Sequence, residues 1–163
     1  MKSATLPSPE IIRPQQKHWG RVIAWLLFVA LMVVVGWKLL QVSRGPVSSG
    51  SAPNFTLTTF DGESATLAEY RGQVVVINFW ASWCGPCEQE AADLEMVWRE
   101  YRDRGVLFLG IDYVDTEAEA RKYLEKWDVT YPNGPDLRTE ISQAYRIRGV
   151  PETYVVDKHG DLA

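Results

Sequence analysis

Apolar positions along the chain form one long continuous run near the start and several short runs after it. The long run spans residues 22–37 and would make a helix that is apolar all round. Further apolar residues follow Lys38 as far as Val42. A helix needs about 20 such residues to cross the hydrocarbon core of a bilayer, and a lysine near a helix end can extend to the headgroups. The pattern therefore predicts one membrane-spanning helix over residues 22–42.

The sequence on either side of this helix predicts how it lies in the membrane. No A-x-A cleavage pattern follows it, which favours an uncleaved anchor over a removed signal peptide. Four Lys/Arg residues precede the apolar run and two follow it closely. The positive-inside rule then places residues 1–21 in the cytoplasm and the rest of the chain outside a plasma membrane. Residues 43–53 (SRGPVSSGSAP) are rich in Gly, Ser and Pro and are interpreted as a flexible linker.

Short apolar runs between turn residues cover residues 54–163. Residues 74–80 (VVVINFW) and 106–111 (VLFLGI) are typical of strands buried on both faces. Apolar residues at helical spacing predict a helix between them over residues 86–104. Shorter elements are predicted at residues 54–58 (strand), 116–127 (helix opened by a capping box), 139–145 (helix) and 153–156 (strand). Strand–helix–strand order followed by a terminal hairpin predicts an α/β fold, a mixed sheet flanked by helices.

Charge and cysteine content exclude some classes of function. The part of the chain after residue 43 carries 12 basic against 20 acidic residues, which argues against nucleic-acid binding. Only two cysteines occur, so a framework of several disulfides is excluded.

The two cysteines, Cys84 and Cys87, enclose Gly85 and Pro86 and follow Trp83, where the first buried strand passes into the long helix. Free N–H groups and the dipole at a helix N-terminus stabilise a thiolate. Cys84 is therefore predicted to be the attacking sulfur, and Cys87, one turn further, the sulfur that resolves a mixed disulfide. Proline suits the first turn of a helix. The motif predicts redox catalysis by the Cys84–Cys87 pair.

Two cysteines at this spacing can also serve a structural disulfide or a metal site. A structural disulfide closing so short a loop would remove little entropy from the unfolded chain. A zinc site needs two further ligands, and the chain has only His18 and His159. A copper site made by the two thiolates and His159 is an alternative, and it would make the chain a copper-binding chaperone. No resident metal and no cofactor are predicted.

The segment WASWCGPC after the strand VVVINF resembles the active-site region of the thioredoxin superfamily. The anchor, the segment APNFTLTTFDGESATLAEYRG and the segment FLGIDYVDTEAEARKYLEK are similar to its TlpA/ResA/DsbE branch of tethered extracytoplasmic thiol–disulfide oxidoreductases. This resemblance covers residues 52–163. It implies a thioredoxin-like domain over residues 54–163 that acts as a protein-disulfide reductase on disulfide-bearing proteins, apocytochrome c during cytochrome c maturation among them. An extracytoplasmic reductant also implies a membrane electron-donor protein of thiol-shuttle type as partner.

The resemblance carries roles to particular positions. Val150-Pro151 matches the loop opposite the CxxC motif, which implies a cis-proline, a Val150 backbone that holds a partner chain extended, and a ring that excludes metal. Glu90 matches an acidic position of ResA-like proteins, which implies a role in tuning the cysteines or relaying a proton. Glu152 matches the "PET" form of DsbE-like members, where its charge would raise the thiol pKa.

Trp80 and Trp83 are expected to shield the cysteine pair from water. Thioredoxin itself has an Asp in its first strands, and VVVINF shows no equivalent, which makes the two glutamates the candidates for proton handling. The chain stops at Ala163, where the branch usually adds a completed edge strand and a final helix, so both are expected to be missing. A thiol peroxidase of the peroxiredoxin type is a further alternative, although Ala81 stands where that group has Thr.

Overall fold

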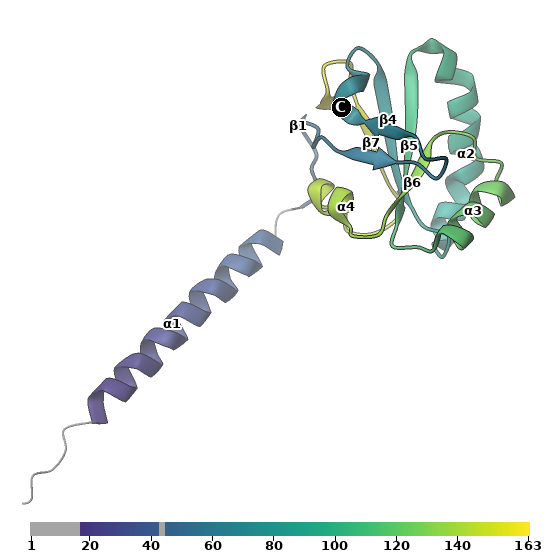
Figure 1. Cartoon of the computed structure of the whole chain (residues 1–163). Helices are drawn as coiled ribbons and strands as arrows, with labels where there is room; N and C mark the ends of the chain where they lie inside the picture. The colour runs from purple at the N-terminus through teal and green to yellow at the C-terminus, as the bar shows by residue number, and fades with distance from the viewer. Residues whose placement is uncertain (1–16, 43–44) are drawn as a thin grey trace, which may run out of the picture. The chain divides into compact units, whose positions relative to one another are not determined.

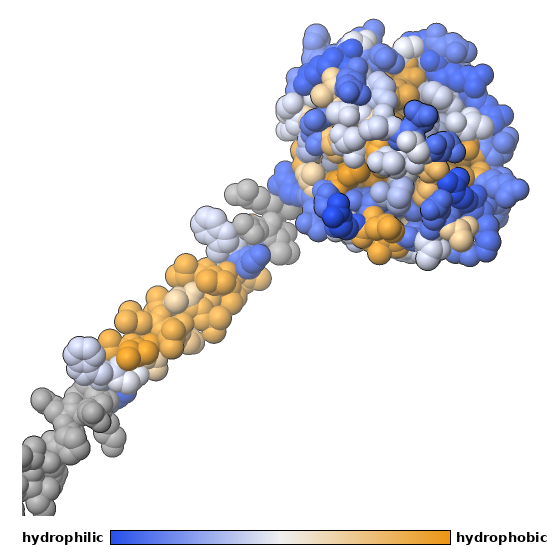
Figure 2. Space-filling model, viewed as in Figure 1, coloured by the Kyte–Doolittle hydropathy of each residue, from blue (hydrophilic) through white to orange (hydrophobic). Residues whose placement is uncertain are grey.

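The computed structural model describes residues 17–42 and 45–163, which fall into two separate units (Figure 1). The first described unit is one helix, α1 (Lys17–Val42). Within the described residues it is the only helix long and apolar enough to cross a membrane, over Trp19–Leu40 with a mean hydropathy of 2.4. Figure 2 shows apolar residues along the length of this helix. It begins five residues before the predicted span, and the rest of the predicted cytoplasmic segment, residues 1–16, lies outside the described residues.

The second unit contains a six-stranded mixed sheet in the order β1-β8-β7-β4-β5-β6. Its strands are β1 (Gly50–Ser51), β4 (Val74–Trp80), β5 (Val106–Tyr113), β6 (Asn133–Asp136), β7 (Glu152–Val156) and β8 (Asp161–Leu162). β4, β5 and β6 run parallel, while β7 pairs antiparallel with β4, β8 with β7 and β1 with β8. A separate two-stranded sheet pairs β2 (Thr56–Thr58) with β3 (Ser64–Thr66). The predicted parallel pair and antiparallel addition are confirmed.

Helices cover both faces of the sheet. The helical segments of this unit are η1 (Leu67–Tyr70), α2 (Gly85–Tyr101), η2 (Arg102–Arg104), α3 (Glu117–Lys126) and α4 (Glu140–Tyr145). Alternate residues of β4 point to opposite faces: Phe79 packs with Tyr145 of α4, whereas Trp80 packs with Cys87 of α2 and Tyr123 of α3. α2 and α3 therefore lie on one face of the sheet, called the α2 face below, and α4 on the other, called the α4 face (Figure 1).

Part of the predicted linker belongs to the folded unit instead. Within residues 45–53, the Val47 N–H donates to the Tyr145 carbonyl at 3.1 Å, and Gly50 and Ser51 form β1 on the edge of the sheet. The prediction of a flexible linker over residues 43–53 is therefore wrong for these residues, because their backbone groups are paired. β8 is only two residues long, but it is paired on both sides, by β7 and by β1.

The predicted helix over residues 86–104 ends earlier, at Tyr101, and Gly105 with a φ of 79° turns the chain into β5. The strand β6 has no counterpart in the sequence prediction. Its residues (NGPD) are typical of a turn, but they pair with β5, and a Cβ at Gly134 would lie 2.3 Å from the Thr58 carbonyl oxygen. Glycine is needed here because two strands approach closely.

Candidate active site

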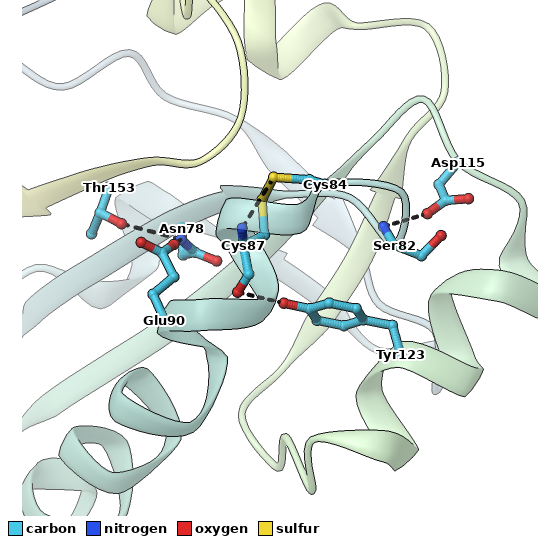
Figure 3. Close-up of a disulfide and its surroundings, with 8 residues drawn as sticks. All are labelled: Asn78, Ser82, Cys84, Cys87, Glu90, Asp115, Tyr123 and Thr153. Carbon is cyan, nitrogen blue, oxygen red and sulfur yellow. Dashed lines mark hydrogen bonds between the residues drawn. A yellow bond between two sulfur atoms is a disulfide. The ribbon is translucent and has the colours of Figure 1, made fainter.

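The cysteine pair lies where β4 leads into α2. The Cys84 N–H donates to the Ala81 carbonyl at 3.1 Å, which turns the chain at the end of the strand. Cys84 is the N-cap of α2, and its Sγ accepts the Cys87 N–H at 3.2 Å (Figure 3). Pro86 lies in the first helical turn, where its missing N–H has no intrahelical partner to lose. The predicted placement of Cys84 at a helix N-terminus is confirmed, and this position favours its thiolate after reduction.

Cys84 and Cys87 form a disulfide with an S–S distance of 2.06 Å (Figure 3). Cys84 is 4% exposed and Cys87 1% exposed. The carbonyl of Cys87 also accepts the Tyr123 hydroxyl at 2.9 Å, which ties this turn of α2 to α3. Cys87 is thus the less exposed of the two residues, as expected for the resolving cysteine.

The two tryptophans near the pair occupy different environments. Trp80 is buried in the same cluster as both cysteines, stacks on Tyr123 at 4.4 Å and donates its Nε1–H to Asn133 Oδ1 at 2.8 Å. Trp83 is 61% exposed, and its Nε1–H points to the Val114 carbonyl at 3.4 Å. Trp80 therefore lies where the expected shielding requires it, whereas Trp83 presents most of its ring to solvent beside Cys84.

The peptide bond between Val150 and Pro151 is cis, as predicted. Val150 is partly buried and packs against the cluster that contains Cys84 and Cys87. The loop before β7 thus lies next to the disulfide, where the resemblance placed it. That its backbone holds a partner chain stays a prediction.

Glu90 lies on α2 one turn after Cys87, and its carboxylate Oε1 accepts an N–H of the Asn78 side chain at 3.0 Å. Burial raises the pKa of Glu90, and the hydrogen bond from Asn78 acts in the opposite direction. Asn78 donates its other N–H to Thr153 Oγ1 at 3.1 Å. In Figure 3 these three residues lie together on one side of the disulfide. A half-buried carboxylate one turn from the resolving sulfur, with its pKa raised by burial, is suited to exchange a proton with that sulfur.

Glu152 lies elsewhere. Thr153 is paired with Asn78 on the α2 face, so the preceding residue points to the α4 face. The carboxylate of Glu152 accepts the Arg148 N–H at 2.6 Å and the Tyr154 hydroxyl at 2.8 Å. The structure therefore does not bring Glu152 together with Glu90, and the expected effect of its charge on the thiols stays a prediction.

Asp112 is a buried carboxylate that the sequence prediction missed. It is the register partner of Trp80 across β4 and β5, which puts its side chain on the α2 face. It is fully buried, and neither of its oxygens has a hydrogen-bond partner within residues 17–42 and 45–163. Burial raises the pKa of Asp112 to about 7, and the charge of Asp115 adds to the shift. The signal was an acid at the end of a buried strand, but that strand was predicted to stop at Ile111.

Asp115 holds the loop that precedes the cysteines. Its carboxylate accepts the N–H of Ser82 at 2.7 Å (Figure 3). It also accepts the N–H of Thr116 at 2.7 Å. Within the part of the chain that the structure describes, no group of three or more His, Cys, Asp or Glu side chains is arranged to hold a metal ion.

Comparisons with known proteins agree with this geometry. The AhpC/TSA family model matches residues 49–163. The chain is 29% identical over 151 residues to the thiol-disulfide oxidoreductase ResA of Geobacillus kaustophilus, covering 90% of this chain and 87% of that protein. It is 31% identical over 151 residues to the thioredoxin-like protein YneN of Bacillus subtilis, covering 88% and 86%. A secreted disulfide oxidoreductase of Mycobacterium tuberculosis, homologous to Escherichia coli DsbE, superposes with a TM-score of 0.62 at 26% identity, covering 67% of this chain and 80% of that one.

Proposed function

Because the chain belongs to the thioredoxin-like AhpC/TSA family and is a thiol–disulfide oxidoreductase of the ResA/DsbE type, we propose that it reduces disulfides in extracytoplasmic proteins. The observation that carries this proposal is the Cys84–Cys87 disulfide at the N-terminus of α2, beside the Val150–Pro151 loop. Helix α1 supports attachment to a membrane by its length and composition. The secreted relative from Mycobacterium tuberculosis supports a site of action outside the cytoplasm.

The reaction begins from the reduced pair. The Cys84 thiolate attacks one sulfur of a partner disulfide and forms a mixed disulfide, while the other partner sulfur leaves as a thiolate and takes up a proton. Cys87 then loses its proton and attacks Cys84 Sγ, which closes the Cys84–Cys87 disulfide and releases the second partner thiol. Two electrons and two protons pass to the partner in each cycle. A membrane protein with a dithiol restores the reduced pair by the reverse exchange.

Three further residues support this cycle. Glu90 is the proposed acceptor for the proton of Cys87, since it follows Cys87 by one turn of α2 and its pKa is raised by burial. The Val150 backbone and Pro151 are proposed to hold the partner chain extended beside Cys84. The oxidised CxxCH segment of an apocytochrome c is proposed as a partner on the resemblance to the TlpA/ResA/DsbE branch.

The proposal can be tested with the full chain in detergent micelles. Reduced protein should reduce the disulfides of insulin, with the reaction followed by the turbidity of the released chains. Cys84→Ser should abolish the activity, and Cys87→Ser should instead accumulate a mixed disulfide with insulin that mass spectrometry detects. Insulin reduction that survives in Cys84→Ser would contradict the proposal, as would consumption of hydrogen peroxide in place of insulin.

Location needs a separate experiment. In intact cells that produce the chain, a membrane-impermeant maleimide should label Cys84 after mild reduction, and cell lysis should not increase the labelling. The Cys84→Ser, Cys87→Ser double variant is the control for background. Labelling that requires lysis would place the domain on the cytoplasmic side and contradict this part of the proposal.

A further inference from the structure

A three-residue network links the sheet to the helix that carries the cysteines. Asn78 lies in the middle of β4 and is 2% exposed. Its side-chain amide donates one N–H to Glu90 on α2, at 3.0 Å, and the other to Thr153 on β7, at 3.1 Å (Figure 3). Both hydrogens of the amide are therefore used, each by a different element.

The network fixes the carboxylate of Glu90. Asn78 and Thr153 are directly opposite each other on two antiparallel strands, so their contact is set by the register of the sheet. Turning the buried amide away would leave polar hydrogens without partners, which is unfavourable. A glutamate on a helix surface is normally free to change rotamer, but here the sheet determines where its Oε1 lies.

The chemistry of an amide determines which protonation state of Glu90 the network favours. A side-chain amide donates hydrogen bonds but neither gains nor loses a proton in this pH range. A donor to a carboxylate favours its ionised, proton-accepting form. Burial favours the protonated form of Glu90, and Asn78 opposes that effect.

We propose that Asn78, anchored by Thr153, is a positioning residue that holds Glu90 in place and in its proton-accepting form for the resolving step. The inference rests on the proposed function, since it concerns the proton of Cys87. In that step the Cys87 S–H bond breaks, the proton passes to Glu90, and the sulfur's electron pair forms the bond to Cys84 Sγ. The Cys84–partner bond breaks, the partner leaves as a thiolate, and Glu90 later returns its proton to solvent.

Other titratable groups face Glu90 and must be distinguished from it. On the neighbouring elements, burial raises the pKa of Tyr123 and of Tyr131 above the range in which the test is made. On α2 itself, Glu88 is paired with Lys126 at 3.0 Å, and Glu95 is hydrogen-bonded to Arg99 and Thr130.

Asp112 also lies on the α2 face, and its pKa of about 7 falls inside the tested range. Adding Glu90→Gln to the Asn78→Ala variant therefore shows whether a shift in the pH dependence of resolution arises from Glu90 or from Asp112.

The test separates the two exchange steps with 5,5′-dithiobis(2-nitrobenzoate) and the reduced full chain in detergent micelles. The first thionitrobenzoate is released when Cys84 attacks, and the second when Cys87 resolves the mixed disulfide. The rate of the second phase is measured from pH 5 to 9. Asn78→Ala should move the acid limb of this profile by about one unit to higher pH, since a buried carboxylate loses its donor. The first phase should keep its wild-type profile.

Thr153 provides a matched pair of variants at an exposed position, in case Asn78→Ala does not fold. Thr153→Val removes the hydroxyl without changing the shape and should shift the same limb in the same direction. Thr153→Ser keeps the hydroxyl and should restore the wild-type profile. In a Glu90→Gln background, Asn78→Ala should cause no further shift.

Two results would overturn the inference: profiles of Asn78→Ala and Thr153→Val that overlay the wild type, or a shift that persists in Glu90→Gln. Failure of the proposed function looks different. In that case the wild-type chain would show no first phase from Cys84, whereas failure of the inference leaves both phases present and unshifted.

Discussion

Replacing Asp112 by asparagine should stabilise the domain at neutral pH and leave its stability almost unchanged at pH 4. The side chain is fully buried beside Trp80, and within the described residues neither carboxylate oxygen has a hydrogen-bond partner. A buried carboxylate without partners disfavours its ionised form. Asparagine has nearly the shape of the protonated acid but carries no charge at any pH, so the two side chains should differ only where Asp112 is ionised.

The size of the effect follows from linkage. Burial raises the pKa of Asp112 from 3.8 to about 7, a shift of about three units, and each unit corresponds to about 1.4 kcal/mol. The native state then keeps a proton between about pH 4 and pH 7 that the unfolded state has already lost. The contribution of Asp112 to the unfolding free energy is therefore fully present below about pH 4. It is lost as the pH rises to about 7, which lowers the unfolding free energy by at most about 4 kcal/mol.

The assay is equilibrium unfolding in guanidinium chloride, with the full oxidised chain in detergent micelles, at four pH values between 4 and 8. The difference in unfolding free energy between Asp112→Asn and wild type should grow from near zero to about 2–4 kcal/mol. The matched control is Asp103→Asn, whose side chain is 88% exposed and which should change stability by less than about 0.5 kcal/mol at each pH. A difference that does not depend on pH, or that favours the wild type at pH 8, would refute this reasoning.

Three other substitutions test separate features. Glu95→Ala removes a buried carboxylate that accepts three hydrogen bonds and should lower the unfolding free energy by about 2–4 kcal/mol, measured by guanidinium unfolding at pH 7. Gly134→Ala places a methyl group 2.3 Å from the Thr58 carbonyl oxygen and should cost about 1–3 kcal/mol, seen as a lower thermal midpoint. Asn78→Asp replaces the donor 3.0 Å from Glu90 by a second carboxyl group, so the acid limb of the resolving step should move to higher pH than in Asn78→Ala.

Local sequence patterns were sufficient for the elements that carry the cysteines. β4 was predictable because seven consecutive residues suit a strand buried on both faces, and α2 because Cys84 and Pro86 suit a helix start. The N-cap of α3 was also predictable, and the Thr116 hydroxyl does accept the Glu119 N–H at 3.3 Å. β6 was not, since its residues favour a turn and only pairing with β5 makes them a strand. That pairing is a long-range contact that no local pattern contains.

The same distinction separates the residues of the site. The sequence offered Glu90 and Glu152 as equivalent candidates, because each lies a few residues from a motif. The structure separates them through the alternation of β7, which turns Thr153 to the α2 face and Glu152 to the α4 face. The sequence indicated no role for Asn78, because the strand VVVINF was notable only for lacking the Asp that thioredoxin has. Its two hydrogen bonds depend on the register of β4 against β7 and on the position of α2.

The helix geometry also explains why one cysteine needs a proton acceptor more than the other. Cys84 is the N-cap, so its sulfur accepts the Cys87 N–H and lies at the positive end of the helix dipole, which stabilises a thiolate directly. Cys87 lies inside that turn, where its own N–H is directed to Cys84 Sγ and its side chain is 1% exposed among apolar neighbours. A thiolate is unfavourable in such surroundings, so resolution by Cys87 requires a base that is already in place. Glu90 is one turn away on the same helix, and Asn78 on the sheet keeps its carboxylate there.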